Sequence, residues 1–493
     1  MRLPFGYAYD ERMLEHVCNY DPTMAERPER MKIIHERLEK ERLLRNIYWV
    51  QSREAVEDEL LLNHPIEIIR EMNALDTDEA CENFCKSHEI LWMNPKSEQA
   101  ARIAVGNCIE MLKAHHDKRV GNGFAVVRPP GHHAYGKSPM GYCVYNNVAI
   151  TAKYAVEKLG YKRVSIIDFD YHPANGTYYS VKDDPRIMLV SFHSYHRGLF
   201  WPYSRDFDYN TKDNSMFFPL NCNMNTESDY LAAFNHVIMP VLKEWDTDLV
   251  LVSAGFDAGY YDIMLTLGQA IKAHGYGHIA RLLDAAFPDR VLGILEGGYF
   301  SECYSESAYQ FTRGLQGLEI PEVTHDARVN GSMAEVIWNN IVHHSPRWKS
   351  LQAWQDKLQA QQKSLGLEPY TPDNQLYLGH EVKELWNKVV SSGLCRTREW
   401  FPEMTPESVD LCTSKINEVK QNYKYAQAIT QPSEEQLLKQ LVWDQKAMLE
   451  CHTKSLPSLE FWTDQYQAFK DGRLDHMMVC DWDLIRKSGI KFF

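Results

Sequence analysis

Short apolar runs recur along the first two thirds of the chain, and polar residues follow each of them. Continuous runs of this kind are typical of strands buried on both faces of a parallel sheet. Segments with apolar residues at helical spacing lie between them. This alternation predicts an α/β fold, a mainly parallel sheet with helices on both faces. The predicted strands cover residues 124–127, 163–167, 187–193, 248–257 and 290–299, and the helices include residues 31–38, 98–113, 230–242 and 268–285.

The pattern changes after about Trp348. The remainder is rich in glutamine, lysine, glutamate and tryptophan, is interrupted by prolines, and has helical patterns over residues 350–364 and 434–452. We therefore predict a first, α/β domain over residues 1–348 and a helical C-terminal extension over residues 349–493. The extension is expected to pack on the first domain, to mediate association, or to stabilise the protein.

Composition narrows the classes of function. The 493 residues carry a net charge of −14, which argues against a broad nucleic-acid-binding surface. The eleven cysteines include no C-x-x-C pair, which favours a reducing compartment. The N-terminus does not resemble a secretory signal, and no long apolar run predicts a membrane span. We expect an intracellular protein, cytoplasmic or nuclear.

Acidic side chains gather at the end of the strand predicted over residues 163–167. Asp168, Asp170 and His172 alternate along an extended segment, so their side chains share one side. Asp257 ends a later strand, and in such folds ligands bind beyond the carboxyl ends of the strands. Two carboxylates and an imidazole suit zinc and leave one position open. Asp170, His172 and Asp257 are therefore the predicted ligands of one catalytic zinc ion.

Two neighbouring histidines, His132 and His133, follow another predicted strand. Prolines and a glycine over residues 129–131 set a rigid turn before them. We expect these imidazoles to act as general base and general acid on an activated water and a leaving group. Each needs a partner that orients it, and Asp168 and Asn175 are the candidates.

Tyr299 follows Gly297-Gly298 at the end of the last predicted strand. The glycines let the backbone approach closely, and the tyrosine hydroxyl could donate a hydrogen bond to a developing oxyanion. Together with the metal ligands and the histidines, this residue predicts metal-assisted hydrolysis of an amide without a covalent intermediate.

Other motifs carry less weight. The chain has no H-E-x-x-H, no G-x-S-x-G and no Walker loop. Cys143 lies in an apolar run and is interpreted as a buried structural cysteine. The histidine pairs at residues 115–116 and 343–344 are interpreted as having no role in the site, and the charged run over residues 26–30 as a solvated helix start.

Four motifs resemble those of the zinc-dependent histone deacetylases, and their sequences are similar to class II of that family. They lie in the family's order within residues 7–348 and read Arg128-Pro-Pro-Gly-His-His-Ala134, Asp168-x-Asp-x-His172 with Asn175-Gly-Thr, Ser253-Ala-Gly-Phe-Asp-Ala258 and Glu296-Gly-Gly-Tyr299. The resemblance implies the arginase/deacetylase fold, a single zinc ion and hydrolysis of acyl-lysine. It implies the same zinc ligands, the tandem histidines with their two partners, and Tyr299 as the residue that polarises the carbonyl. It also implies a structural potassium ion near the zinc, bound through Asp168, Asp170, His172, Ser191 and Phe192.

Departures from the family pattern concern the acyl-lysine channel. Its two walls are usually phenylalanines, and the matching residues here are Tyr142 and Trp201. A tryptophan there is expected to narrow the channel or to change acyl preference. Met264 stands where a polyamine-deacetylating relative has a glutamate, which favours peptides over polyamines.

Two further departures lie in loops. Pro173 and Ala174 stiffen the segment before Asn175 and could shift it. The acid–serine pair at the channel rim is replaced by Glu89-Ile90, which weakens the expected recognition of the substrate backbone.

The leading hypothesis is a zinc-dependent protein lysine deacetylase that acts on histones or other acetylated proteins. A role in chromatin and transcription regulation, with corepressor partners bound through the C-terminal extension, would accompany it. One alternative is a non-catalytic acyl-lysine binder or corepressor scaffold, and another is an acetylpolyamine amidohydrolase. An arginase-like enzyme with two manganese ions is disfavoured, because acids are found for only one metal's ligand set.

Overall fold

The computed structural model describes most of the first part of the chain and less of the second. The described residues are 2–195, 198, 200–209, 213–220, 225–260, 262, 269–323, 329, 331–367, 406–426, 433–439 and 441. Three of the predictions concern residues outside these ranges. They are Met264, residue 268 at the start of the helix predicted over residues 268–285, and most of the helix predicted over residues 434–452.

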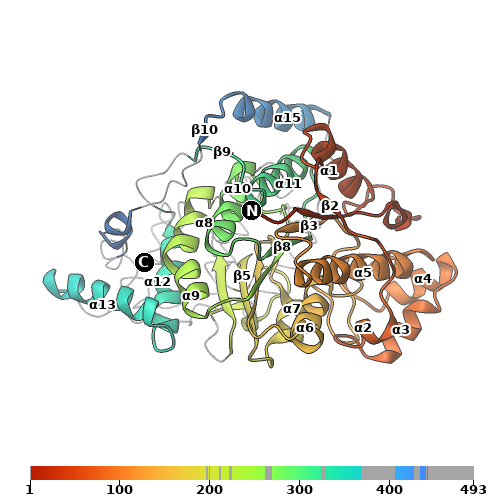
Figure 1. Cartoon of the computed structure of the whole chain (residues 1–493), viewed down its shortest axis with the longest axis horizontal. Coiled ribbons are helices and arrows are strands. Elements are labelled where there is room, and N and C mark those ends of the chain that lie inside the picture. Colours follow the sequence, from red (N-terminus) through yellow and green to blue (C-terminus); the bar gives the residue numbers. More distant parts are fainter. Residues whose placement is uncertain are drawn as a thin grey trace, which may run out of the picture.

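A parallel sheet of eight strands forms the centre of the molecule, in the order β2-β1-β3-β8-β7-β4-β5-β6 (Figure 1). The five predicted strands are five of its six inner strands, and their continuous apolar character follows from having both faces covered. The prediction of an α/β fold with a mainly parallel sheet is confirmed. The strands are β1 (Gly6–Ala8), β2 (Tyr48–Trp49), β3 (Gly123–Ala125), β4 (Val164–Asp168), β5 (Ile187–Ser194), β6 (Met216–Leu220), β7 (Leu249–Ala254) and β8 (Val291–Leu295).

Three strands were not predicted. β1 and β2 are too short to show a hydrophobic period. β6 contains Pro219, which cannot donate to a ladder, and it lies at the edge of the sheet, where proline is tolerated. Two predicted strands are too long. β7 and β8 end at Ala254 and Leu295, earlier than the apolar runs suggest, because the following residues leave the sheet to form the site.

Helices cover both faces of the sheet (Figure 1). α5 packs on α6, while α11 packs on α1 and α10. The helix predicted over residues 230–242 is divided by a π turn, Phe234–Ile238, next to Pro240, which has no N–H to continue the ladder. The helices are α1 (Glu29–Lys40), α2 (Glu57–Leu60), α3 (Ile66–Asn73), α4 (Asp78–Cys85), α5 (Ser97–His116), α6 (Asn147–Lys158), α7 (Asn175–Val181), α8 (Glu227–Ala233), α9 (Met239–Glu244), α10 (Ala273–Ala286), α11 (Ser301–Leu315), α12 (Gly331–His344), α13 (Lys349–Ser364) and α15 (Pro406–Gln421).

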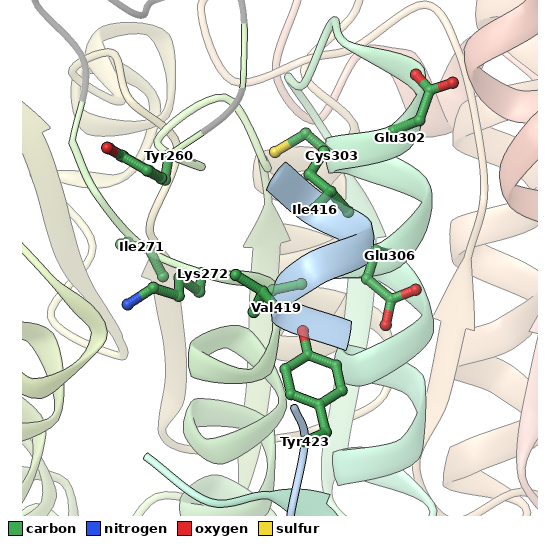
Figure 2. A pocket seen from close by; sticks show the side chains of 10 residues that line it. Tyr260, Ile271, Lys272, Glu302, Cys303, Glu306, Ile416, Val419 and Tyr423 are labelled. Atoms are coloured by element: carbon green, nitrogen blue, oxygen red, sulfur yellow. The ribbon is translucent and has the colours of Figure 1, made fainter. Parts of the chain in front are cut away.

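The C-terminal helix α15 packs against α11 (Figures 1 and 2). Cys412 and Ile416 of α15 form an apolar cluster with Phe300 and Cys303. Beyond α15, the short strand β10 (Tyr425–Ala426) pairs antiparallel with β9 (Ile320–Pro321). Of the three roles expected for the extension, packing on the first part of the chain is therefore seen, whereas the boundary at residue 348 stays a prediction. Within the described ranges, no helix combines the length and the apolar character that crossing a bilayer requires.

Candidate active site

The predicted metal ligands and catalytic residues lie at or after the ends of four adjacent strands, β3, β8, β7 and β4, whose carboxyl ends lie at the same edge of the sheet. The register aligns Asp168, at the end of β4, with Ser253 of β7, and Ser253 with Ile294 of β8. The loops that follow these strands therefore meet. In the order of the sheet they carry His132 with His133, then Tyr299, then Asp257, then Asp170 with His172.

Asp170, His172 and Asp257 form one buried cluster, with donor atoms that all lie within 4.8 Å of one another. The Nδ1 atom of His172 is 2.9 Å from Oδ1 of Asp170 and 3.2 Å from Oδ2 of Asp257. Glycines keep this space open. A Cβ atom at Gly255 would lie 2.0 Å from Oδ2 of Asp170, and one at Gly297 would lie 2.6 Å from Oδ2 of Asp257. Two carboxylates and an imidazole in such a cradle fit a divalent cation of the zinc type.

Each of the tandem histidines meets one of the two candidate partners. The Nδ1 atom of His132 lies 3.1 Å from Oδ2 of Asp168, and that of His133 lies 2.6 Å from Oδ1 of Asn175. The two rings are 3.9 Å apart between centroids, and all four residues are buried. The stiff residues before Asn175 have not moved it out of reach of His133. The Nδ1 bonds leave each Nε2 on the other side of its ring, and that of His132 lies 3.7 Å from Oδ1 of Asp170, in the predicted metal cluster.

The surroundings separate the two imidazoles electrostatically. Burial alone would lower the pKa of His132, but the negative charges of Asp170 and Asp168 outweigh it and raise the pKa to about 10. Burial, followed by electrostatic repulsion from the neighbouring imidazoles, that of His132 first, holds the pKa of His133 well below its ordinary value. A cation bound by the acids would weaken their effect on His132. Without a cation, the surroundings therefore give the two histidines different proton affinities, higher for His132 than for His133.

Glu296 binds the backbone of the loop that carries His132 and His133, which we call the histidine loop. Its Oε2 atom accepts hydrogen bonds from the backbone N–H of Gly131 at 2.7 Å and of His132 at 3.1 Å. Cys143 is buried, as interpreted from the sequence, and its sulfur accepts from the N–H of His133 at 3.4 Å. Burial keeps the pKa of the Cys143 thiol well above its ordinary value, so a thiolate nucleophile is disfavoured. His132, Cys143 and Glu296 also lie close together, but these contacts make the last two a support for the loop.

Tyr299 is positioned by two residues that the sequence analysis did not identify. The Oδ2 atom of Asp262 accepts from the N–H groups of Tyr299 at 2.8 Å and Phe300 at 3.0 Å. The guanidinium of Arg30 lies 5.0 Å from the centroid of the Tyr299 ring and donates to the carbonyl of Gly298 at 2.5 Å. Gly298 itself has φ +114°, a conformation that L side chains rarely adopt.

The first and last residues of the charged run at residues 26–30 are buried. The interpretation of this run as a solvated helix start is therefore wrong for these two residues. Glu26 and Arg30 are fully buried, with exposed fractions of 0% and 1%. Glu26 accepts from Arg30 at 2.9 Å and from two nitrogens of Arg128 at 2.8 and 3.0 Å. The i, i+4 spacing of Glu26 and Arg30 was the only local signal, because Arg128 is about one hundred residues away in the chain.

The predicted channel walls flank the histidines and the tyrosine. The Trp201 ring stands edge-on to His133, with centroids 4.7 Å apart and an interplanar angle of 87°. Tyr142 lies 6.1 Å from Tyr299 between ring centroids. Met264, the third predicted channel residue, lies outside the described residues.

Comparisons with known proteins agree with this geometry. Residues 24–315, more than half of the chain, match the histone deacetylase domain family. A crystal structure of the HDA15 HD domain superposes with a TM-score of 0.65 at 28% sequence identity, covering 73% of this chain and 99% of that one.

Curated relatives are similar over the same region. The polyamine deacetylase HDAC10 of Homo sapiens is 34% identical over 66% of this chain and 50% of its own length. Histone deacetylase 9 of Homo sapiens is 32% identical over 73% of this chain and 37% of its own length. Histone deacetylase clr3 of Schizosaccharomyces pombe is 34% identical over 64% and 48%. The chain thus spans about half the length of these relatives, or less. The match of the domain family, the shared fold and these identities show that the chain belongs to the histone deacetylase family.

Proposed function

We propose that this protein is a zinc-dependent hydrolase that removes acetyl groups from lysine side chains of histones or other proteins. The observation that carries the proposal is the meeting of a three-residue metal cradle, two oppositely tuned histidines and one tyrosine at the ends of four adjacent strands. An acyl-lysine binder would not need both imidazoles with separated proton affinities.

Asp170, His172 and Asp257 would hold the zinc ion, which when bound lowers the pKa of water and withdraws charge from a carbonyl. His133, kept neutral by its surroundings, accepts the proton of the attacking water. His132 donates a proton to the leaving lysine nitrogen. Asn175 and Asp168 keep the two rings in the required orientation. Tyr299 donates its hydroxyl proton in a hydrogen bond to the oxyanion.

Replacing Tyr299 with phenylalanine tests this mechanism, because only the hydroxyl is removed. We expect Tyr299→Phe to lower kcat on an acetyl-lysine peptide by about 100-fold or more, the cost of losing one oxyanion donor. Zinc content, measured by atomic emission, should stay at one ion per chain. Tyr154→Phe, on α6 outside the site, is the matched control and should keep full activity. Full activity in Tyr299→Phe would remove this tyrosine from the mechanism.

Zinc itself is tested through its ligands. Asp257→Ala removes one of the three donors, so we expect zinc in dialysed protein to fall to a small fraction of one equivalent, together with loss of turnover. One full equivalent in that variant would place the metal elsewhere.

The structural potassium ion also stays a proposal. Ser191, one of its expected ligands, lies beside Asp168 in the register of β4 and β5.

A second candidate substrate is an acetylated polyamine, favoured by the similarity to the polyamine deacetylase HDAC10. Turnover of an acetyl-lysine peptide and of acetylspermidine should be compared on the same preparation. We expect the peptide to be preferred. Binding of the peptide without turnover of either substrate would favour the non-catalytic scaffold. Recruitment of corepressor partners through the C-terminal segment, and residence in nucleus or cytoplasm, belong to the proposal in the same way.

A further inference from the structure

Glu89 is hydrogen-bonded to Trp201 through its side chain and to Gly141, the neighbour of Tyr142, through its carbonyl, although it is exposed and lies outside the catalytic cluster. We propose that Glu89 is a positioning residue that clamps Trp201 against the wall carrying Tyr142, and so sets the width of the channel and the length of acyl chain that enters. This inference rests on the proposed deacylase function and adds a specificity determinant to it.

The backbone of this loop holds the first wall. The N–H of Gly141 donates to the carbonyl of Glu89 at 3.0 Å, and the N–H of Tyr142 donates to the carbonyl of Ile90 at 2.9 Å. Tyr142 and Ile90 have backbone φ angles of +66° and +50°, in a region that residues other than glycine seldom occupy. Such conformations persist where the surroundings impose them, often at functional sites. The two bonds therefore fix the wall that carries Tyr142 to the loop of Glu89.

The side chain of Glu89 holds the second wall. Its Oε1 atom accepts a hydrogen bond from Nε1 of Trp201 at 2.7 Å. That nitrogen is the only polar atom of a tryptophan side chain, and a bond to a carboxylate is stronger than one to a neutral acceptor. Trp201 is 8% exposed, and its ring edge stands on His133. Rotating the indole out of the channel would break this bond, so Glu89 restrains the ring in place.

Glu89 is one of the two rim residues that depart from the family pattern, and its side chain has a hydrogen-bond partner within the protein. One of its two carboxylate oxygens, Oε1, accepts from Nε1 of Trp201. With both walls tied to one residue, the channel resists widening and favours the short acetyl group over longer acyl chains. Glu89 thus acts on the reaction through the shape of the channel, by means of its acceptor oxygen.

The test compares kcat/KM for acetyl-lysine and butyryl-lysine in one peptide sequence. Glu89→Ala and Trp201→Phe each remove the same hydrogen bond from opposite ends. We expect each to raise the butyryl-to-acetyl ratio by about 5-fold, the worth of one hydrogen bond. The double variant should do no more than the larger single effect, because the two residues act as a unit. Glu89→Gln keeps an acceptor oxygen and should preserve the wild-type ratio. Glu71→Ala, an exposed glutamate on α3, is the control.

A readout without turnover separates this inference from the proposed function. The protein contains twelve tryptophans, and ¹⁹F NMR of 5-fluorotryptophan-labelled protein identifies the Trp201 signal by its loss in Trp201→Phe. Glu89→Ala should shift that signal, whereas Glu89→Gln should shift it little. A shifted signal with no deacylation of any peptide by wild type would overturn the proposed function and leave the clamp standing. Normal deacylation with an unmoved signal and an unchanged acyl ratio, or independent effects of the two variants, would overturn the clamp.

Discussion

Glu26 shows how a single buried carboxylate can organise loops that are distant in the chain. It accepts from Arg30 and Arg128, and these arginines in turn donate to the backbone carbonyls of Gly298 and His16. Burial alone would raise the pKa of Glu26, but the charge of Arg128, followed by His16 and Arg30, holds it well below its ordinary value. The Tyr299 loop and the histidine loop therefore share one electrostatic support.

Removing the negative charge of Glu26 should destabilise the folded protein. Glu26→Gln leaves two buried guanidinium groups without their counter-ion, so we expect the free energy of unfolding to fall by about 3 kcal/mol in urea titrations. Glu36→Gln, also near α1, breaks a pair with Lys32 in which both side chains are more than half exposed. That variant should leave stability almost unchanged. Equal losses in the two variants would show that Glu26 is not a structural hub.

At the scale of elements, α15 is attached to the sheet domain by one apolar stripe and a few polar contacts. Ile416 lies beside Cys303 of α11 in Figure 2, whereas Val419 lies on the side of Ile271 and Lys272, just before α10. Lys420 adds an ion pair with Glu306 at 3.1 Å. A helix of this length is marginal on its own in water, so its stability depends on the apolar contact.

An aspartate in that stripe should release the helix. Ile416→Asp buries a charge against Phe300 and Cys303, and we expect hydrogen exchange over residues 406–421 to become at least about 100-fold faster, the equivalent of roughly 3 kcal/mol. Exchange in the inner strands should not change. Asn417→Asp places the same charge on the exposed side of α15 and should keep exchange slow. Slow exchange in both variants would mean that the contact does not hold α15.

At the scale of the whole molecule, several histidines are buried in uncharged form. Burial lowers the pKa of His16, His64, His115 and His193 to about 4 and that of His344 to about 3. The histidine pairs at residues 115–116 and 343–344 thus contain core residues without a place in the site. His115 is hydrogen-bonded on both ring nitrogens, to the hydroxyl of Tyr161 and to the carbonyl of Asp289, each at 2.9 Å.

This burial makes stability depend on pH. A histidine with a folded pKa of about 4 and an unfolded pKa of about 6.5 binds more protons when unfolded between these values. Its contribution is therefore complete above pH 6.5 and is lost as pH falls towards 4. We expect the free energy of unfolding to rise with pH across this window, and His115→Gln to reduce the slope. His116→Gln, at the exposed neighbour, should leave the slope as in wild type, and equal slopes in all three proteins would contradict this account.

The same scales show how far sequence reasoning reaches. Inner strands such as β4 and β7 were predictable because parallel strands buried on both faces leave continuous apolar runs. The site residues were found because short motifs place them at the ends of those strands. Asp262, Arg30 and the bond between Glu89 and Trp201 were not found, since each joins segments far apart in the chain.

Local pattern alone therefore determined the fold class, the strand ends that carry polar residues, and the kinds of side chain available for chemistry. Tertiary structure decided which of these side chains meet, since register and strand order bring four loops to one edge of the sheet. It also decided which charges are buried. The physical reason is that hydrophobic period is a property of neighbouring residues, whereas burial, ion pairing and the pKa of His132 or His133 depend on atoms supplied by distant ones.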